Sequence, residues 1–263
     1  MTVSTDRREA VIALARRAAL EILAVYESLF AIEHKQDRSP LTAADLASHR
    51  CIVAGLQALT PEIPVLSEES KDLDIAARRE WPTLWLVDPL DGTREFIKRN
   101  GEFTVNIALI EHGVATFGVI QQPVTGALWH GAAGAGAFRR EGDADVAICS
   151  RKPASAPLRI AASRSHRDAR TQALLDALPG SEVVGCGSSL KFCRIAEGGI
   201  DLYPRFGPTS EWDTAAGQAI VEAAGGAVLD PRGRPLRYNQ RDTLLNGDFL
   251  AFGDIAVRNA LPA

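Results

Sequence analysis

The stretch from residue 158 to residue 229 constrains the fold most, because short apolar segments alternate there with segments of helical periodicity. The expected strands are 158–162, 182–185, 200–203 and 227–229, and the expected helices are 168–178, 189–197 and 213–224. Gly225-Gly226 ends the last helix, since glycine readily takes the conformation that follows a helix C-terminus. Such alternation is typical of a layered α/β arrangement.

The first half of the chain is organised differently. Apolar residues three or four apart predict an amphipathic helix from about Asp6 to Ile32. Thr42 and Asp45 form a capping box, which predicts a second helix that stops at Pro61. An antiparallel sheet should follow, with a buried strand at 85–87 and a hairpin made of 103–110 and 114–121.

The polar, proline-punctuated stretch 150–157 is the best candidate for a linker. We therefore expect an α/β protein whose N-terminal half is α+β. The N-terminal domain would span residues 1–152 and the C-terminal α/β domain residues 153–263.

Composition excludes several classes of function. The 29 basic and 33 acidic residues give a net charge of −4, which leaves no general electrostatic case for nucleic-acid binding. No stretch has the roughly 18 unbroken apolar residues that a membrane span needs. The four cysteines contain no CxxC pair, as expected of reduced thiols. These features favour a soluble cytoplasmic protein without a strong membrane signal.

The most informative segment for chemistry is 84–93. A buried strand is expected to end at Asp88, with Pro89 blocking its continuation and Asp91 returning after a tight turn. Two carboxylates and the carbonyl of Leu90 suit a hard divalent cation such as Mg²⁺. The amides of Gly92 and Thr93 could face a phosphate if a helix begins there. An ordinary turn would use the same residue types.

Three further segments carry acidic residues before or within predicted elements. Glu68-Glu69 follows an apolar segment, Asp213 opens a helix rich in glycine and alanine, and Asp37 lies in a polar loop. Each has a plain structural interpretation, as a solvated pair or a helix cap. A cap does not explain the small residues up to Gly217, which let something approach that helix closely.

Together these segments resemble the inositol monophosphatase superfamily, the Mg²⁺-dependent, lithium-sensitive phosphatases. Residues 85–93 and 212–217 resemble its two signatures in the right order, and the Glu68-Glu69 pair ahead of them also fits. The resemblance runs from about Lys35 to Gly226. It implies a layered α-β-α-β-α sandwich of the inositol monophosphatase and fructose-1,6-bisphosphatase type.

Residues 35–42, 187–193 and 201–213 look most like the 3'(2'),5'-bisphosphate nucleotidases of this superfamily. That resemblance implies a small-molecule substrate, adenosine 3',5'-bisphosphate (PAP), hydrolysed to AMP and phosphate in sulfur metabolism. It leaves open whether the sulfated form, PAPS, is also a substrate. It also leaves open whether the protein is a monomer or a homodimer, and whether it is peripheral at the inner membrane.

The resemblance further implies roles for single residues. Two or three Mg²⁺ ions would be held by Glu68, Asp88, the Leu90 carbonyl, Asp91 and Asp213, most of them in the N-terminal domain. The ions would neutralise the phosphate and lower the pKa of a bound water. Asp37, with Thr93 as relay, would orient that water as general base.

The implied substrate contacts extend beyond the metal ligands. Lys191 and Arg205 would bind the second phosphate, and His166 would lie near the adenosine. The remaining contacts would come from residues in or beside the signatures: Glu68, Leu90, Asp91, Gly92, Thr93, Ser188 and Asp213. Two alternatives remain at this point: an inositol or sugar monophosphatase on the same scaffold, and a non-catalytic metal or nucleotide sensor.

Overall fold

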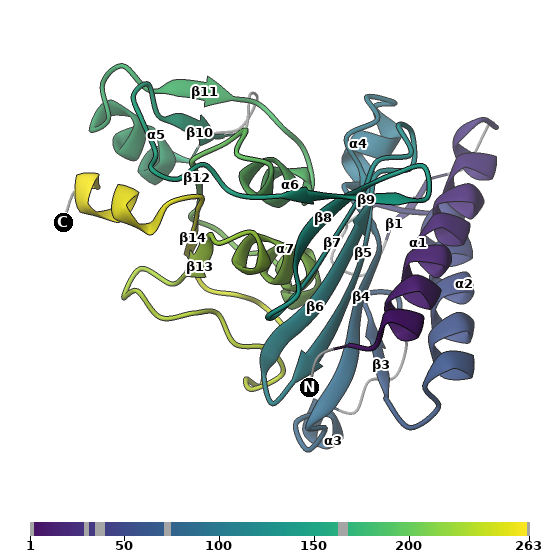
Figure 1. Cartoon of the computed structure of the whole chain (residues 1–263). Helices are drawn as coiled ribbons and strands as arrows, with labels where there is room; N and C mark the ends of the chain where they lie inside the picture. Colours follow the sequence, from purple (N-terminus) through teal and green to yellow (C-terminus); the bar gives the residue numbers. More distant parts are fainter. Residues whose placement is uncertain (1–2, 29–31, 35–39, 71–74, 163–167, 262–263) are drawn as a thin grey trace.

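The computed structural model describes residues 3–28, 32–34, 40–70, 75–162 and 168–261. Two helices cover one face of a seven-stranded sheet, two more lie between that sheet and a five-stranded sheet, and a fifth covers the far face (Figure 1). Three apolar clusters fill the spaces between these layers. The result is the expected α-β-α-β-α sandwich.

The larger sheet contains seven strands in sequence order. They are β3 (Val65–Ser67), β4 (Thr83–Asp91), β5 (Thr104–Glu111), β6 (Val114–Gln121), β7 (Leu128–Ala132), β8 (Gly136–Glu141) and β9 (Ala144–Ile148). Strand β3 is parallel to β4, and every later pair is antiparallel. The β5–β6 pair is the predicted hairpin.

The smaller sheet has the order β11 (Glu182–Val184), β10 (Arg159–Ala161), β12 (Leu202–Arg205), β14 (Phe249–Phe252) and β13 (Ala227–Leu229). It alternates with α5 (Ala169–Asp176), α6 (Leu190–Ala196) and α7 (Glu211–Ala223) as predicted. Strand β14, which pairs with β12 and β13, was not predicted from the sequence. Helix η1 (Ile255–Ala260) follows it.

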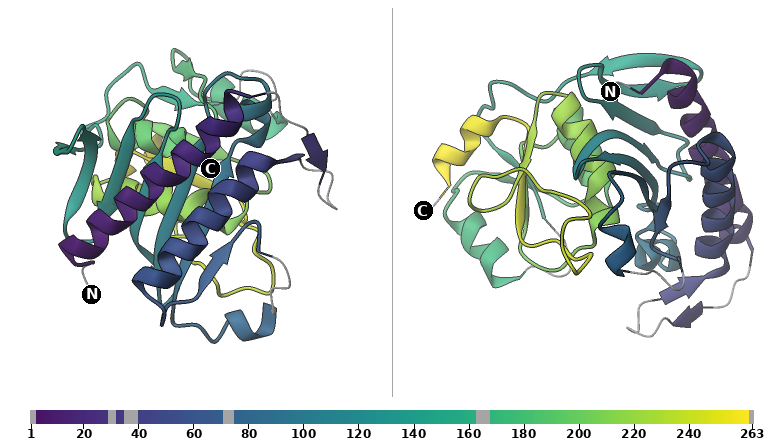
Figure 2. Two further views of the ribbon diagram at one scale, coloured as in Figure 1. Left: turned by 90° about the vertical axis from the view of Figure 1, so that its right-hand side faces the viewer. Right: turned by 90° about the horizontal axis from the view of Figure 1, so that it is seen from below.

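The helices α1 (Thr5–Tyr26) and α2 (Ala43–Leu59) pack side by side on the outer face of the larger sheet (Figure 2). The predicted first helix was too long, because the chain leaves α1 after Tyr26 and forms β1 (Ile32–His34), which pairs with β2 (Pro40–Thr42). No helix in the described ranges is long and apolar enough to cross a membrane. The remaining helices, α3 (Ile75–Arg78) and α4 (Thr93–Ile97), are short.

Helix α7 touches the larger sheet backbone to backbone. Gly118 and Gly131 are directly paired across β6 and β7. A Cβ on Gly118 would lie 2.4 Å from the carbonyl oxygen of Ala216, and one on Gly131 would lie 2.9 Å from the Cα of Ile220. Two glycines therefore let α7, which carries Asp213, rest directly on the backbones of β6 and β7.

The small residues of α7 also allow close packing, here against α6. A Cβ on Gly217 would lie 2.4 Å from the ring of Phe192 on α6. The close approach expected from the sequence is thus made by a phenylalanine and by the sheet. The apolar cluster around α7 contains residues of both sheets, so the two halves of the chain share one core. The domain boundary expected at residue 152 stays a prediction.

Candidate active site

Three carboxylates from distant parts of the chain meet at one end of the larger sheet. One oxygen from each of Asp88, Asp91 and Asp213 lies within 4.8 Å of the others. Glu68 joins them, because β3 and β4 are parallel and the Glu68 N–H donates to the carbonyl of Val87 at 3.0 Å. The structure thus brings together the four acids that the sequence indicated.

The backbone of β4 positions Asp88 and Asp91 toward the same site. The strand does not end at Asp88 as expected but runs on to Asp91 through a register shift, with Asp88 opposite Asn106 and Asp91 opposite Thr104. One extra residue on β4 makes this a bulge, where proline needs no ladder hydrogen bond. The tight turn predicted from the sequence was therefore wrong, although both acids reach the same site.

The bulge is held by hydrogen bonds around Leu90. The Leu90 N–H donates to Oδ1 of Asp88 at 3.0 Å, and Oγ of Ser48 donates to the Pro89 carbonyl at 2.7 Å. The Leu90 side chain is buried in the core beneath the outer helices. Only its backbone carbonyl is therefore available to a ligand, as the sequence interpretation required.

The four carboxylates repel one another in a region with little water. Asp88 is 1% exposed, and its pKa is raised well above the ordinary value by burial and then by the charges of Glu68, Asp91 and Asp213. Burial and the charge of Asp91 raise the pKa of Asp213 to about 8. Each shift records the cost of ionising a buried acid beside other carboxylates.

The donor set fits a hard divalent cation. Carboxylate and carbonyl oxygens are the ligands that Mg²⁺ prefers, and opposite oxygens on one Mg²⁺ lie about 4 Å apart. The spacing of up to 4.8 Å in the cluster is close to that span. A cation would also remove the repulsion that raises the two pKa values. The acidic cluster is therefore suited to hold metal.

A fifth acid, which the sequence marked only as a helix cap, belongs to the same region. Oγ1 of Thr93 lies 3.3 Å from Oδ1 of Asp45 and 3.4 Å from the Leu90 carbonyl. Oδ2 of Asp45 accepts the Thr42 N–H at 2.8 Å, as the predicted capping box requires. Asp45 is 1% exposed. Asp37, the expected base, lies outside the described residues.

The segment before α6 holds Asp91 in place. Oγ of Ser188 donates to Oδ2 of Asp91 at 2.7 Å, and the Ser189 N–H donates to the same oxygen at 2.6 Å. Ser188 has φ +52° and Gly92, against which it packs, has φ +91°. The sequence predicted Ser188 as a substrate contact, and the structure adds this bond to a carboxylate.

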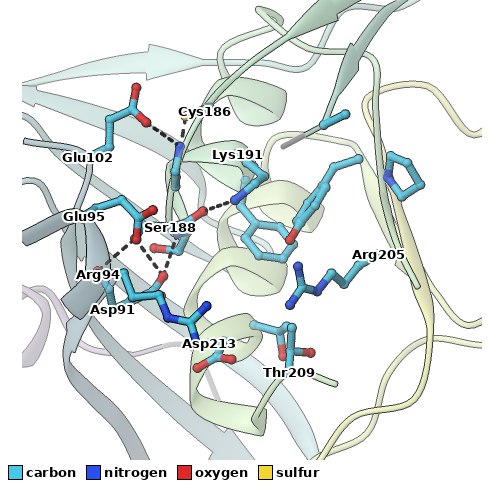
Figure 3. Close-up of a pocket in the computed structure, with 18 of the residues that line it drawn as sticks. Asp91, Arg94, Glu95, Glu102, Cys186, Ser188, Lys191, Arg205, Thr209 and Asp213 are labelled. Atoms are coloured by element: carbon cyan, nitrogen blue, oxygen red, sulfur yellow. Dashed lines mark hydrogen bonds between the residues drawn. The ribbon is translucent and has the colours of Figure 1, made fainter. Parts of the chain in front are cut away.

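A cavity of about 900 Å³ opens beside the acidic cluster (Figure 3). Its wall includes most of the predicted contact residues: Asp91, Gly92, Ser188, Lys191, Arg205 and Asp213. Glu68, Leu90 and Thr93 are not among its lining residues, and His166 lies outside the described residues. The wall also includes residues that the sequence did not single out, among them Arg94, Glu102 and Asp168.

The predicted cations of the cavity have different environments. Nζ of Lys191 donates to the Ser188 carbonyl at 2.8 Å and lies 5.1 Å from the centre of the Tyr203 ring. Nη2 of Arg205 donates to the Pro208 carbonyl at 3.1 Å, and its Nε is buried with no hydrogen-bond partner within the described chain. Arg205 therefore has more donors free for a ligand.

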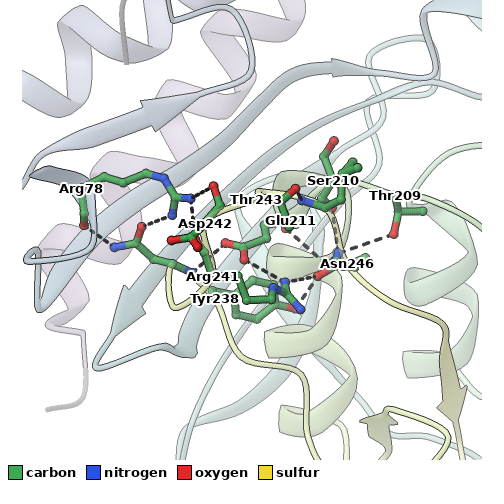
Figure 4. A network of polar contacts seen from close by, with 12 residues as sticks. Arg78, Thr209, Ser210, Glu211, Tyr238, Arg241, Asp242, Thr243 and Asn246 are labelled. Carbon is green, nitrogen blue, oxygen red and sulfur yellow. Dashed lines mark hydrogen bonds and ion pairs between the residues drawn. The ribbon is translucent and has the colours of Figure 1, made fainter. Parts of the chain in front are cut away.

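Helix α7, which carries Asp213, is anchored by a second polar cluster at its first turn (Figure 4). The helix begins at Glu211, two residues earlier than predicted. Glu211 is fully buried and accepts hydrogen bonds from the Asn239 N–H at 2.7 Å and from Nη2 of Arg241 at 2.8 Å. Asn246 accepts from Arg241 at 3.0 Å and donates to the Ser210 carbonyl at 2.9 Å.

Arg78 connects this cluster to α3. Its guanidinium is buried and donates to the side chain of Asn239 at 2.8 Å and to the carbonyls of Arg241 and Asp242 at 2.7 and 3.1 Å. Sequence reasoning missed the whole cluster, because Arg78 and its partners are 161 to 164 residues apart. The cluster fixes the helix start from which Asp213 reaches the site.

Comparison with known proteins agrees with this geometry. Residues 5–256 match the inositol monophosphatase family. The chain belongs to that family. Two relatives named 3'(2'),5'-bisphosphate nucleotidase CysQ are each 50% identical to it. The one from Escherichia coli O6:H1 aligns over 238 residues, 90% of this chain and 95% of that protein, and the one from Salmonella typhimurium over 243 residues, 92% and 97%.

Solved structures give the same fold. The crystal structure of CysQ from Bacteroides thetaiotaomicron, a bacterial member of the inositol monophosphatase family, has a TM-score of 0.81 at 43% identity and covers 93% of this chain and 96% of that one. An inositol monophosphatase from Thermotoga maritima has a TM-score of 0.80 at 22% identity, covering 97% and 95%. The layered sandwich predicted from the sequence is confirmed.

Proposed function

We propose that this protein is a 3'(2'),5'-bisphosphate nucleotidase that hydrolyses PAP to AMP and phosphate with the help of Mg²⁺. One observation carries the proposal: four carboxylates converge beside a cavity whose wall also presents lysine and arginine. Such a site can hold cations for one phosphate and bind a second phosphate directly. The 50% identity to proteins of that name supports the choice of substrate.

The residues that would hold two to three Mg²⁺ ions are Glu68, Asp88, the Leu90 carbonyl, Asp91 and Asp213. When bound, such ions neutralise phosphate charge and lower the pKa of a coordinated water. The protein's own contribution is the rigid spacing of these ligands. The bulge in β4 fixes Asp88 and Asp91, and the polar cluster at the start of α7 fixes Asp213.

Asp45 and Thr93 would orient the attacking water. The Thr93 hydroxyl donates to Oδ1 of Asp45, so its own oxygen is free to accept a proton from water. The water oxygen would then bond to phosphorus as the bond between phosphorus and the ribose oxygen breaks. The water proton would pass through Thr93 to Asp45, and the departing ribose oxygen would take up a proton from solvent to become the hydroxyl of AMP. The assignment of Asp37 as the base, with Thr93 as relay, stays a prediction from the sequence resemblance.

The substrate's other groups would lie along the cavity. Arg205 would bind the second phosphate, Lys191 would order the neighbouring turn and add positive charge, and His166 would lie near the adenosine. PAPS carries the same 3'-phosphate and would fit the same ligands. Because PAP is left when sulfate is transferred from PAPS, the protein would act in sulfur metabolism.

Phosphate release from PAP, measured with Mg²⁺ and with EDTA beside inositol 1-phosphate, tests the proposal. We expect release from PAP only with Mg²⁺ and much slower release from inositol 1-phosphate. Faster release from inositol 1-phosphate would favour the monophosphatase alternative. Metal binding without release from either compound would indicate a sensor.

A further inference from the structure

Among the residues that the structure describes, four cationic side chains line the cavity, and they are not equally available. Lys191 is held by the Ser188 carbonyl and the Tyr203 ring. Arg94 and Lys98, both exposed residues of the α4 region, have no side-chain hydrogen bond or ion pair within the part of the chain that the structure describes. Arg205 has a buried Nε without a partner. Of the four side chains, the guanidinium groups of Arg94 and Arg205 thus have the most N–H donors left for a ligand.

These two arginines face each other across the cavity. Arg94 directly follows Thr93 at the start of α4, one residue beyond the signature segment, whereas Arg205 ends β12 in the other sheet. Figure 3 shows both guanidinium groups directed into the cavity from opposite sides, with Asp213 at its edge. Both therefore lie beside the acidic cluster without belonging to it.

The chemistry of the substrate calls for such a pair. The two phosphates of PAP are attached to one ribose, so the second must bind within one sugar of the first. The first phosphate belongs at the carboxylates and their cations. A guanidinium binds two phosphate oxygens at once, and two such groups on opposite walls could hold one phosphate from both sides.

We infer that Arg94 is a specificity-determining residue which, with Arg205, binds the second phosphate of the bisphosphate substrate. This inference rests on the proposed nucleotidase activity. Arg94 shares the part that the sequence interpretation gave to Lys191, because the Ser188 carbonyl uses one of the three ammonium donors of Lys191. Selectivity for a bisphosphate over a monophosphate then comes from one arginine on helix α4 and one at the end of strand β12.

The test compares steady-state phosphate release from PAP and from adenosine 3'-monophosphate, which lacks the second phosphate. In Arg94→Ala we expect the KM for PAP to rise roughly 10- to 100-fold, because a charged hydrogen-bonding partner is lost. The kcat/KM ratio between the two substrates should fall by a similar factor. Arg94→Lys should recover part of it, since lysine keeps the charge but not the fork.

Lys98→Ala is the matched control, because it removes one positive charge from the same side of the cavity. A similar fall in selectivity in Lys98→Ala would mean that general charge, not Arg94, sets the preference. An equal loss on both substrates in Arg94→Ala would place Arg94 at the scissile phosphate. An unchanged ratio would also overturn the inference.

Binding of AMP by calorimetry separates this inference from the proposed function, since AMP carries the second phosphate alone. If wild-type protein binds AMP and Arg94→Ala binds it at least tenfold more weakly, the pair stands even if PAP is not hydrolysed. If PAP is hydrolysed but AMP binds both proteins equally, the inference fails and the nucleotidase proposal survives.

Discussion

Two clusters of charged side chains meet at the first turn of α7, and they are balanced in opposite ways. Glu211 is fully buried, yet Arg241 and a backbone N–H neutralise it within the protein. Asp213, two residues further on, faces three more carboxylates, and its pKa rises to about 8 through burial and then the charge of Asp91. The first cluster carries its own counter-charge and serves the fold. In the second, the charge of Arg205 offsets the carboxylates only in part, so the cluster is suited to a cation.

The largest expected effect concerns the unbalanced cluster. Asp213→Asn should reduce Mg²⁺-dependent phosphate release from PAP by roughly 10³-fold or more, because one ligand and one charge are lost. The metal-free variant should unfold at the same temperature as wild type or higher, since repulsion is relieved. Phosphate release and thermal unfolding measure the two effects. Unchanged turnover would end the assignment of Asp213 as a ligand.

The balanced cluster should respond in stability instead. Arg241→Met leaves Glu211 buried without its cation. We expect it to lower the free energy of unfolding, measured by urea titration, by about 3 kcal/mol. Arg79→Met is the control, because Arg79 pairs with Asp242 at the surface and should cost less than about 1 kcal/mol. Equal losses in the two variants would mean that Glu211 does not depend on its partner.

Mg²⁺ should stabilise the folded wild-type protein, because a bound cation supplies the positive charge that the acidic cluster needs. At about 100 times its Kd, a ligand that binds only the folded state adds about 2.7 kcal/mol. We expect a corresponding rise in the unfolding temperature, and a much smaller rise in Asp91→Asn. A rise of the same size in that variant would show that Mg²⁺ binds elsewhere.

The last expected effect is a pH dependence of the metal-free protein. A folded-state pKa of about 8 for Asp213 lies above the ordinary value near 4, so the folded state binds more protons between those pH values. Stability in EDTA should therefore fall as the pH rises from about 5 to 8, and the fall should be shallower in Asp213→Asn. Urea titrations at several pH values test this. A slope identical in both proteins would contradict it.

Much of the architecture could be predicted because it follows from local patterns. The β5–β6 hairpin and the alternation in the second half come from periodicity over a few residues. The end of α1 could not be found this way, since the apolar spacing continues past Tyr26 while the chain turns to form β1. Strand β14 was missed because it follows the long irregular segment 230–248 and so lies outside the alternation of strands and helices.

The residues of the site could likewise be predicted only where local sequence patterns mark them. The segment with Asp88 and Asp91 could be recognised because its ligands are three residues apart. Asp45 was seen only as a cap, since nothing in a sequence shows that its second oxygen meets Thr93, 48 residues later. Arg94 has no motif of its own, and only the shape of the cavity gives it a role.

The paired glycines of β6 and β7 have a consequence for how the protein can change. Asp213 reaches the other acids because α7 lies on Gly118 and Gly131 with nothing between the two backbones. The distance between α7 and the strands is thus set by contact between their backbones. Conservative substitutions of side chains elsewhere in the core would not change it. A single methyl group at either glycine would lift one end of α7 and carry a ligand away from its partners, so the tolerance of this enzyme scaffold to mutation should be narrowest at two positions that touch no substrate.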